Sequence, residues 1–95
     1  MTVIGKIIEV SPLFEFNAKN GSFKKRQLVI EAGIGKNYVA FSFIQEDVAK
    51  LDNLSVGDNV AVNFGIFSRK ATAAAGEMWY TEVRGFDASK LSETL

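Results

Sequence analysis

The chain has 95 residues, of which 47% are hydrophobic and 12% aromatic, and its formal net charge is zero. This composition predicts one globular domain and excludes a long disordered chain. The chain has no cysteine, which excludes disulfides and thiolate metal sites, and no histidine, the side chain best suited to proton transfer near neutral pH. We therefore expect a protein that is not an enzyme and that uses no metal, cofactor or other small molecule.

The amino-terminal segment, MTVIGKIIEV, lacks the basic region and the long apolar run of a signal peptide. No stretch of the sequence approaches the roughly 20 apolar residues that span a bilayer. We therefore expect a cytoplasmic protein with no membrane partner.

Alternation of apolar and polar residues predicts a first strand over residues 3–16. The parity of its apolar positions changes between Ile7 and Val10, which indicates a bulge. Pro12 indicates an edge position or the fraying end of this strand.

Asn20-Gly21 predicts a hairpin turn, because both residue types tolerate a positive φ angle. A second strand is expected over residues 23–31, a turn over residues 32–37 and a third strand over residues 38–44. In the third strand Val39, Phe41 and Phe43 alternate with small or polar residues and are expected to point inward.

The period changes to that of a helix over residues 45–54, where acidic residues occupy the first turn. A fourth strand follows over residues 59–69, with Ile66 among its inward positions. Small residues predict a flexible loop over residues 71–76, and a last strand is expected over residues 78–86.

The order of three strands, one helix and two strands predicts an all-β protein with the OB-fold. This fold is a five-stranded Greek-key β-barrel, here with one short helix between its third and fourth strands. An SH3-like barrel is the alternative, although it more often lacks a full helix at that place. We expect a single OB-fold domain over residues 1–90 and a short polar tail over residues 91–95.

Five short motifs carry a family resemblance over residues 3–87. They are Gly5-Lys6-Ile7-Ile8, Asn20-Gly21 followed by Phe23-Lys24-Lys25, Val39-x-Phe41-x-Phe43, Leu54-x-x-Gly57-Asp58-x-Val60, and Gly76-x-x-Trp79-Tyr80-Thr81-Glu82-Val83-Arg84. Their order and spacing resemble bacterial single-stranded-DNA-binding proteins with an OB-fold, and more closely the short, largely uncharacterised relatives of these proteins. The resemblance implies binding of single-stranded DNA. Such proteins usually end in a long tail with an acidic tip that recruits other enzymes, and residues 90–95 do not match it, so we do not expect that recruiting role.

Basic residues gather in two segments and are the candidate phosphate contacts. No acid lies between Glu15 and Glu31, whereas four cations do, and another basic pair precedes the expected loop at 71–76. In the OB-fold the outer surface of the second and third strands faces the ligand. The alternative is that these lysines keep a strand edge soluble. The candidates are Lys19, Lys24, Lys25, Arg26, Arg69, Lys70 and Arg84, the last with Glu82 on the same face as an expected partner.

Aromatic residues near these cations are the candidate stacking platforms for bases. Trp79 and Tyr80 point to opposite faces of the last strand, so at most one lies in the core. The alternative is that Trp79 packs inside with Val83 while Tyr80 lies at a subunit contact. The candidates are Phe23, Tyr38, Phe67, Trp79 and Tyr80.

Together these features predict a protein that binds single-stranded DNA with little sequence preference, with RNA as an alternative ligand. A second hypothesis is a non-enzymatic protein-interaction or assembly module on the same fold, which the zero net charge favours. Outward apolar residues on so small a barrel also predict a homodimer or homotetramer.

Overall fold

The computed structural model describes residues 1–19, 21–33, 37–74 and 76–91. Parts of the expected turn at 32–37, of the loop at 71–76 and of the tail at 91–95, together with Asn20, lie outside these described residues. The elements are β1 (Thr2–Val10), β2 (Phe14–Ala18), β3 (Gly21–Ala32), β4 (Asn37–Ile44), the 3-10 helix η1 (Gln45–Leu51), β5 (Asn59–Ala73) and β6 (Gly76–Lys90).

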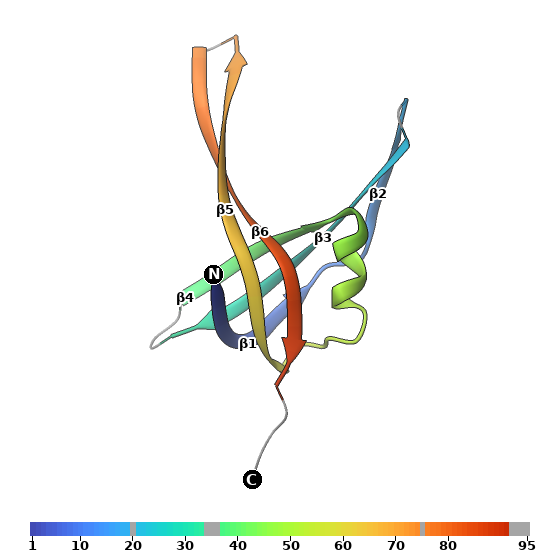
Figure 1. Ribbon diagram of the computed structural model, residues 1–95, viewed down its shortest axis with the longest axis vertical. Coiled ribbons are helices and arrows are strands. Elements are labelled where there is room, and N and C mark those ends of the chain that lie inside the picture. The colour runs from blue at the N-terminus through green and yellow to red at the C-terminus, as the bar shows by residue number, and fades with distance from the viewer. Residues whose placement is uncertain (20, 34–36, 75, 92–95) are drawn as a thin grey trace.

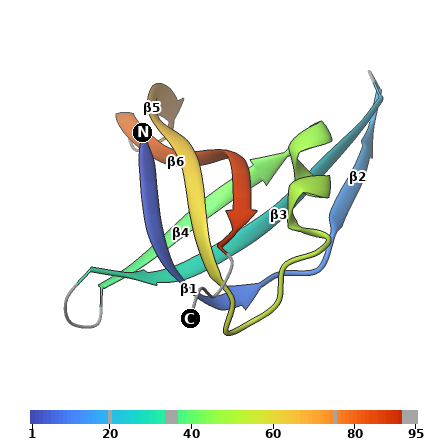
Figure 2. The same ribbon diagram turned by 60° about the horizontal axis from the view of Figure 1, so that its bottom comes forward.

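The strands β1, β5, β6, β4 and β3 follow one another in a sheet, and β1 pairs again with β3, which closes a barrel. The 3-10 helix η1 lies between β4 and β5 in the chain and packs beside β3 (Figures 1 and 2). The predicted five-stranded OB-fold with one short helix is therefore confirmed. The helix ends at Leu51, three residues before the expected boundary.

The expected strand over residues 3–16 is two strands, so that prediction was wrong in its extent. β1 ends at Val10 and β2 begins at Phe14, after an irregular stretch that contains Pro12. Proline has no backbone N–H to donate and favours the end of a strand. The expected bulge is confirmed, because the register of β1 against β3 shifts between Ile7 and Glu9.

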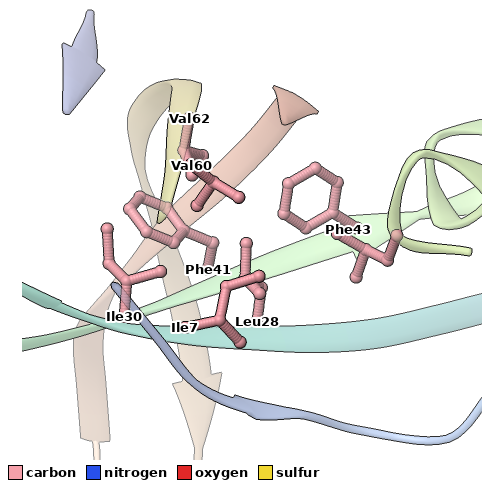
Figure 3. Close-up of a cluster of buried hydrophobic side chains, with 8 residues drawn as sticks. Ile7, Leu28, Ile30, Phe41, Phe43, Val60 and Val62 are labelled. Atoms are coloured by element: carbon pink, nitrogen blue, oxygen red, sulfur yellow. The ribbon is translucent and has the colours of Figure 1, made fainter. Parts of the chain in front are cut away.

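The barrel core consists of apolar side chains with no exposed surface, most of which Figure 3 labels. They are Ile7, Leu28, Ile30, Phe41, Phe43, Leu51, Val60 and Val62. Their positions on β3, β4 and β5 alternate as the sequence predicts, because each strand presents one face to the interior. Ile66, predicted to point inward, is 54% exposed, since the pairing of β5 with β1 ends at Asn63 and Ile66 pairs with Val83 of β6 beyond that point.

Two hairpins extend beyond the barrel and diverge from each other (Figure 1). We call the first the β2–β3 arm, in which Phe14–Ala18 pairs with 21–25. The second is the β5–β6 arm, in which 65–73 pairs with 76–84. The expected loop over residues 71–76 was wrong in extent, because strand pairing continues to Ala73 opposite Gly76.

Candidate nucleic-acid interface

An open groove of about 800 Å³ lies between the two arms. One wall is the β2–β3 arm, the other is the β5–β6 arm, and the floor is the outer face of β4. The groove thus lies on the outer side of the sheet, which is where the sequence predicted a ligand surface.

Aromatic rings dominate the wall formed by the β2–β3 arm. Phe16 lies opposite Phe23 in the ladder, and their rings stack with centroids 5.7 Å apart. Phe14 meets Phe16 edge-on at 4.7 Å, and Lys25 lies opposite Phe14. This wall therefore combines a row of rings with one cation.

Phe14 and Phe16 were missed as candidate stacking residues. The signal was present in the sequence, because a hairpin turn after Lys19 places Phe16 opposite Phe23 and Phe14 opposite Lys25. The predicted strand over residues 3–16 did not separate β2 from β1, so Phe14 and Phe16 were not recognised as part of a hairpin arm. Phe14 is in fact 57% exposed and Phe16 is 47% exposed.

The cations next to Lys25 are placed differently. Arg26 does not line the described groove, and its side chain is only 15% exposed. It donates to the Asp52 carboxylate at 2.8 Å and to the Ser11 carbonyl at 3.1 Å, which ties η1 to the segment between β1 and β2. Lys24 lies on the same side of β3 as Arg26, since neighbouring residues of a strand alternate. Of the three consecutive cations, Lys25 is the one that reaches the groove.

The floor of the groove consists of small residues on β4. Ala40 and Ser42 line it, and Ser42 forms the bridge between β4 and β6 opposite Arg84. Tyr38 lies on the same face of β4 and is 54% exposed, but it is not among the described lining residues. Small side chains leave the floor open to a flat ligand.

Cross-strand pairs build the wall formed by the β5–β6 arm. Arg69 lies opposite Tyr80 in the ladder. The next two pairs toward the barrel are Ser68–Thr81 and Phe67–Glu82, and all four of these residues also line the groove. In the first of these pairs the hydroxyls of Ser68 and Thr81 lie 3.0 Å apart. At its outer end this wall therefore offers the cation of Arg69, the ring of Tyr80 and two hydroxyls.

Phe67 lies opposite Glu82 in the second of these pairs and carries a cation on its ring. The guanidinium carbon of Arg84 lies 5.1 Å from the Phe67 centroid. Nη2 of Arg84 is 3.4 Å from the Glu82 carboxylate, so the expected pair is present. Nε of Arg84 is buried and has no hydrogen-bond partner among the described residues.

Three further predicted residues, in addition to Lys24, Arg26 and Tyr38, lie outside the described lining of the groove. Lys70 lies opposite Trp79 in the ladder, on the other side of the ribbon from Arg69 and Tyr80, and forms an ion pair with Glu77 at 2.7 Å. Trp79 is 68% exposed, so the alternative that places it in the core was wrong. Lys19 is exposed at the tip of the β2–β3 arm.

A family model described as DUF3127, a domain of unknown function, matches residues 2–88. The chain belongs to this family. No curated protein matches the chain in sequence.

Among solved structures, this DUF3127 protein is similar to the crystal structure of a small single-stranded DNA-binding protein from Streptomyces coelicolor. The two chains are 15% identical, with a TM-score of 0.50, over 95% of this chain and 91% of that one. At this identity the likeness shows a common fold. The predicted resemblance to single-strand-binding OB proteins is therefore confirmed at the level of the fold.

Charge is distributed unevenly over this DUF3127 protein. Three of the described lining residues are cations, namely Lys25, Arg69 and Arg84, and one is an acid. Elsewhere on the barrel, Asp58 pairs with Lys90 at 3.5 Å and Asp87 with Lys50 at 3.9 Å. A chain with zero net charge thus presents a groove with a positive excess.

The described part of the chain contains no helix long and apolar enough to cross a membrane. Within those same residues, no group of three or more histidine, cysteine, aspartate or glutamate side chains is arranged to hold a metal ion.

Proposed function

We propose that this DUF3127 protein binds single-stranded DNA in the groove between its two arms, with little sequence preference along the strand. The observation that carries the proposal is the alternation of rings and cations on both walls. On one wall the Phe16–Phe23 pair lies next to Lys25 along the arm, and on the other Tyr80 lies opposite Arg69. The fold that the chain has in common with a small single-stranded DNA-binding protein supports the same conclusion.

Each kind of side chain has a separate role in this proposal. The ammonium of Lys25 and the guanidinium of Arg69 neutralise phosphates. The rings of Phe16, Phe23 and Tyr80 stack on bases, and each stacked base contributes about 1–3 kcal/mol whatever its identity. Stacking on a ring requires an unpaired base, so the groove favours a single strand over a duplex.

Titration of a fluorescein-labelled oligo-dT, followed by anisotropy at two salt concentrations, tests the proposal. With two phosphate contacts, the logarithm of the binding constant is expected to fall with the logarithm of salt with a slope of about −1.4. A parallel titration with oligo-rU tests RNA as the ligand. No anisotropy change with any oligonucleotide would refute the proposal.

Neighbouring residues provide matched control variants. Lys25→Ala and Arg69→Ala are each expected to weaken binding about fivefold at low salt and to make the salt slope less negative by about 0.7. Lys24→Ala and Lys70→Ala remove the same charge one residue away, outside the described lining, and are expected to change binding less than twofold. Equal losses of affinity in the groove variants and in the control variants would contradict the assignment of the groove as the binding site.

The second candidate function is a protein-interaction module or self-assembly. Trp79 and Ile66 favour it, because both are more than half exposed and lie on the same side of the β5–β6 arm. The predicted homodimer or homotetramer stays a prediction. Sedimentation of the protein and of its Trp79→Ser variant tests it: loss of a dimer or tetramer in the variant supports assembly through this arm, and a monomer in both contradicts it.

A further inference from the structure

One side chain of the groove does not suit a surface for phosphates. Glu82 lines the groove and its side chain is 40% exposed, so its carboxylate faces the ligand site and repels phosphate oxygens. A carboxylate accepts hydrogen bonds and donates none. Its presence therefore suits a ligand group that carries N–H donors, and the donors of a nucleic acid strand lie on the edges of its bases.

Arg84 supplies the complementary donors beside this carboxylate. It lies two residues from Glu82 on the same side of β6, and its guanidinium is held over the Phe67 ring. The ion pair between Arg84 and Glu82 is long at 3.4 Å, and both side chains are partly exposed, so it contributes little to stability. Both groups are therefore able to exchange this contact for a contact with a ligand at small cost.

The acceptor and donor groups together match one base edge. The Watson–Crick edge of guanine carries two adjacent donors, N1–H and the N2 amino group, next to the O6 acceptor. A carboxylate accepts from both donors, and a guanidinium donates to O6. Cytosine and adenine offer one amino group each beside ring nitrogens that accept, and thymine offers a single N–H between two carbonyls. Guanine is therefore the base that offers two adjacent donors to the carboxylate together with an acceptor for the guanidinium, whereas thymine offers only one donor beside its acceptor.

We propose that Glu82 and Arg84 form a guanine subsite within the groove, a proposal that rests on single-strand binding by this groove. The space beside Arg84 is consistent with a purine, because Ser42 lies opposite it in the β4–β6 bridge and Ala40 follows on the same floor. Arg84 thus contacts a base edge rather than a phosphate. Binding elsewhere along the strand remains independent of sequence.

The experiment compares a labelled 12-mer of dT with the same 12-mer that carries one central dG. A single guanine avoids four-stranded structures. We expect the dissociation constant to be about tenfold lower with dG, as is usual for a bidentate contact with a base. Inosine lacks the N2 amino group and is expected to lose most of this gain. The analogue 7-deazaguanine keeps the Watson–Crick edge and is expected to retain it.

Two variants with the same charge change test the role of Glu82. Glu82→Gln is expected to abolish the preference for dG and to tighten binding of plain oligo-dT about twofold, because an acid leaves the groove. Glu77→Gln, on the same strand but outside the described lining, is expected to retain the preference. Circular dichroism confirms that both variants are folded.

The outcomes separate this inference from the proposed function. Equal binding of the dG and dT oligonucleotides would overturn the guanine subsite and leave single-strand binding intact. A preference that survives in Glu82→Gln, or that 7-deazaguanine abolishes, would also overturn it. No binding to either oligonucleotide would overturn the proposed function and the subsite together.

Discussion

The barrel and the two arms differ in how their side chains are used. In the barrel, strands from distant parts of the chain surround a core in which eight side chains have no exposed surface. In the arms, two-stranded ribbons leave large apolar side chains such as Phe16 and Trp79 about half exposed or more. A two-stranded ribbon has little stability of its own, so the barrel holds the arms in place.

Together with the proposed function, this difference assigns stability to the barrel and ligand contact to the arms within a chain of 95 residues. Apolar rings inside the barrel lower the free energy of the folded state by leaving water. The same kind of ring on an arm remains exposed to water, as Phe16 and Trp79 show, and contributes less to folding. Substitutions in the two regions are therefore expected to change different measurements.

The largest effect is expected from Phe41→Ala in the barrel. Phe41 is fully buried and its ring lies 5.3 Å from the Phe64 ring, so truncation leaves a cavity. The free energy of unfolding is expected to fall by about 3–5 kcal/mol, measured by urea denaturation. Phe16→Ala on the β2–β3 arm is the matched control, expected to change it by less than about 1 kcal/mol while weakening oligo-dT binding. Similar losses of stability at both positions would contradict the assignment of stability to the barrel and ligand contact to the arms.

A smaller loss is expected from Gly85→Ala, where β6 passes over the core. A Cβ atom at this position would overlap with the Phe43 ring, which lies against the glycine. Overpacking of this kind costs about 1–3 kcal/mol, measured as a lower urea midpoint. Combining Gly85→Ala with Phe43→Leu is expected to recover part of the loss. Strictly additive losses in the double variant would show that this contact is not the cause.

The smallest of these effects is expected from Arg26→Ala. Its guanidinium holds η1 against the segment between β1 and β2, and its loss is expected to lower the free energy of unfolding by about 1–2 kcal/mol. Binding of oligo-dT is expected to change less than twofold. Lys25→Ala, which removes the adjacent cation, is expected to weaken binding of oligo-dT while leaving the free energy of unfolding nearly unchanged. A large binding defect in Arg26→Ala with unchanged stability would restore Arg26 as a phosphate contact.

The barrel was predictable from the sequence because it depends on alternation. Leu28, Phe41 and Val60 recur with their neighbours at the strand period, and all are buried. The length of the β5–β6 arm was not predictable in this way. Residues 71–76 are small and carry no alternation, so the pairing of 71–73 with 76–78 follows from the ladder that the preceding residues begin.

For the candidate site, the sequence indicated the kinds of side chain that line the groove, but less well which residues do so. Strand parity correctly separates Trp79 from Tyr80, but which of them reaches the groove depends on the twist of the ribbon. The position of Arg26 depends on Asp52 and Ser11, which are brought to it by the tertiary fold. Neither the twist of the ribbon nor the tertiary contacts of Arg26 can be predicted from a local sequence pattern.

The root of the β5–β6 arm determines how wide the groove opens. The register of β5 against β6 shifts between Asn63 and Phe64, and glycines at 65 and 85 follow at once on the two strands. The ribbon beyond this register shift extends about 25 Å at the usual rise of a strand. Over that length, a difference of about 10° in the direction of the arm at its base displaces its tip by about 4 Å. The few residues around the register shift therefore set the width of the groove between the two arms.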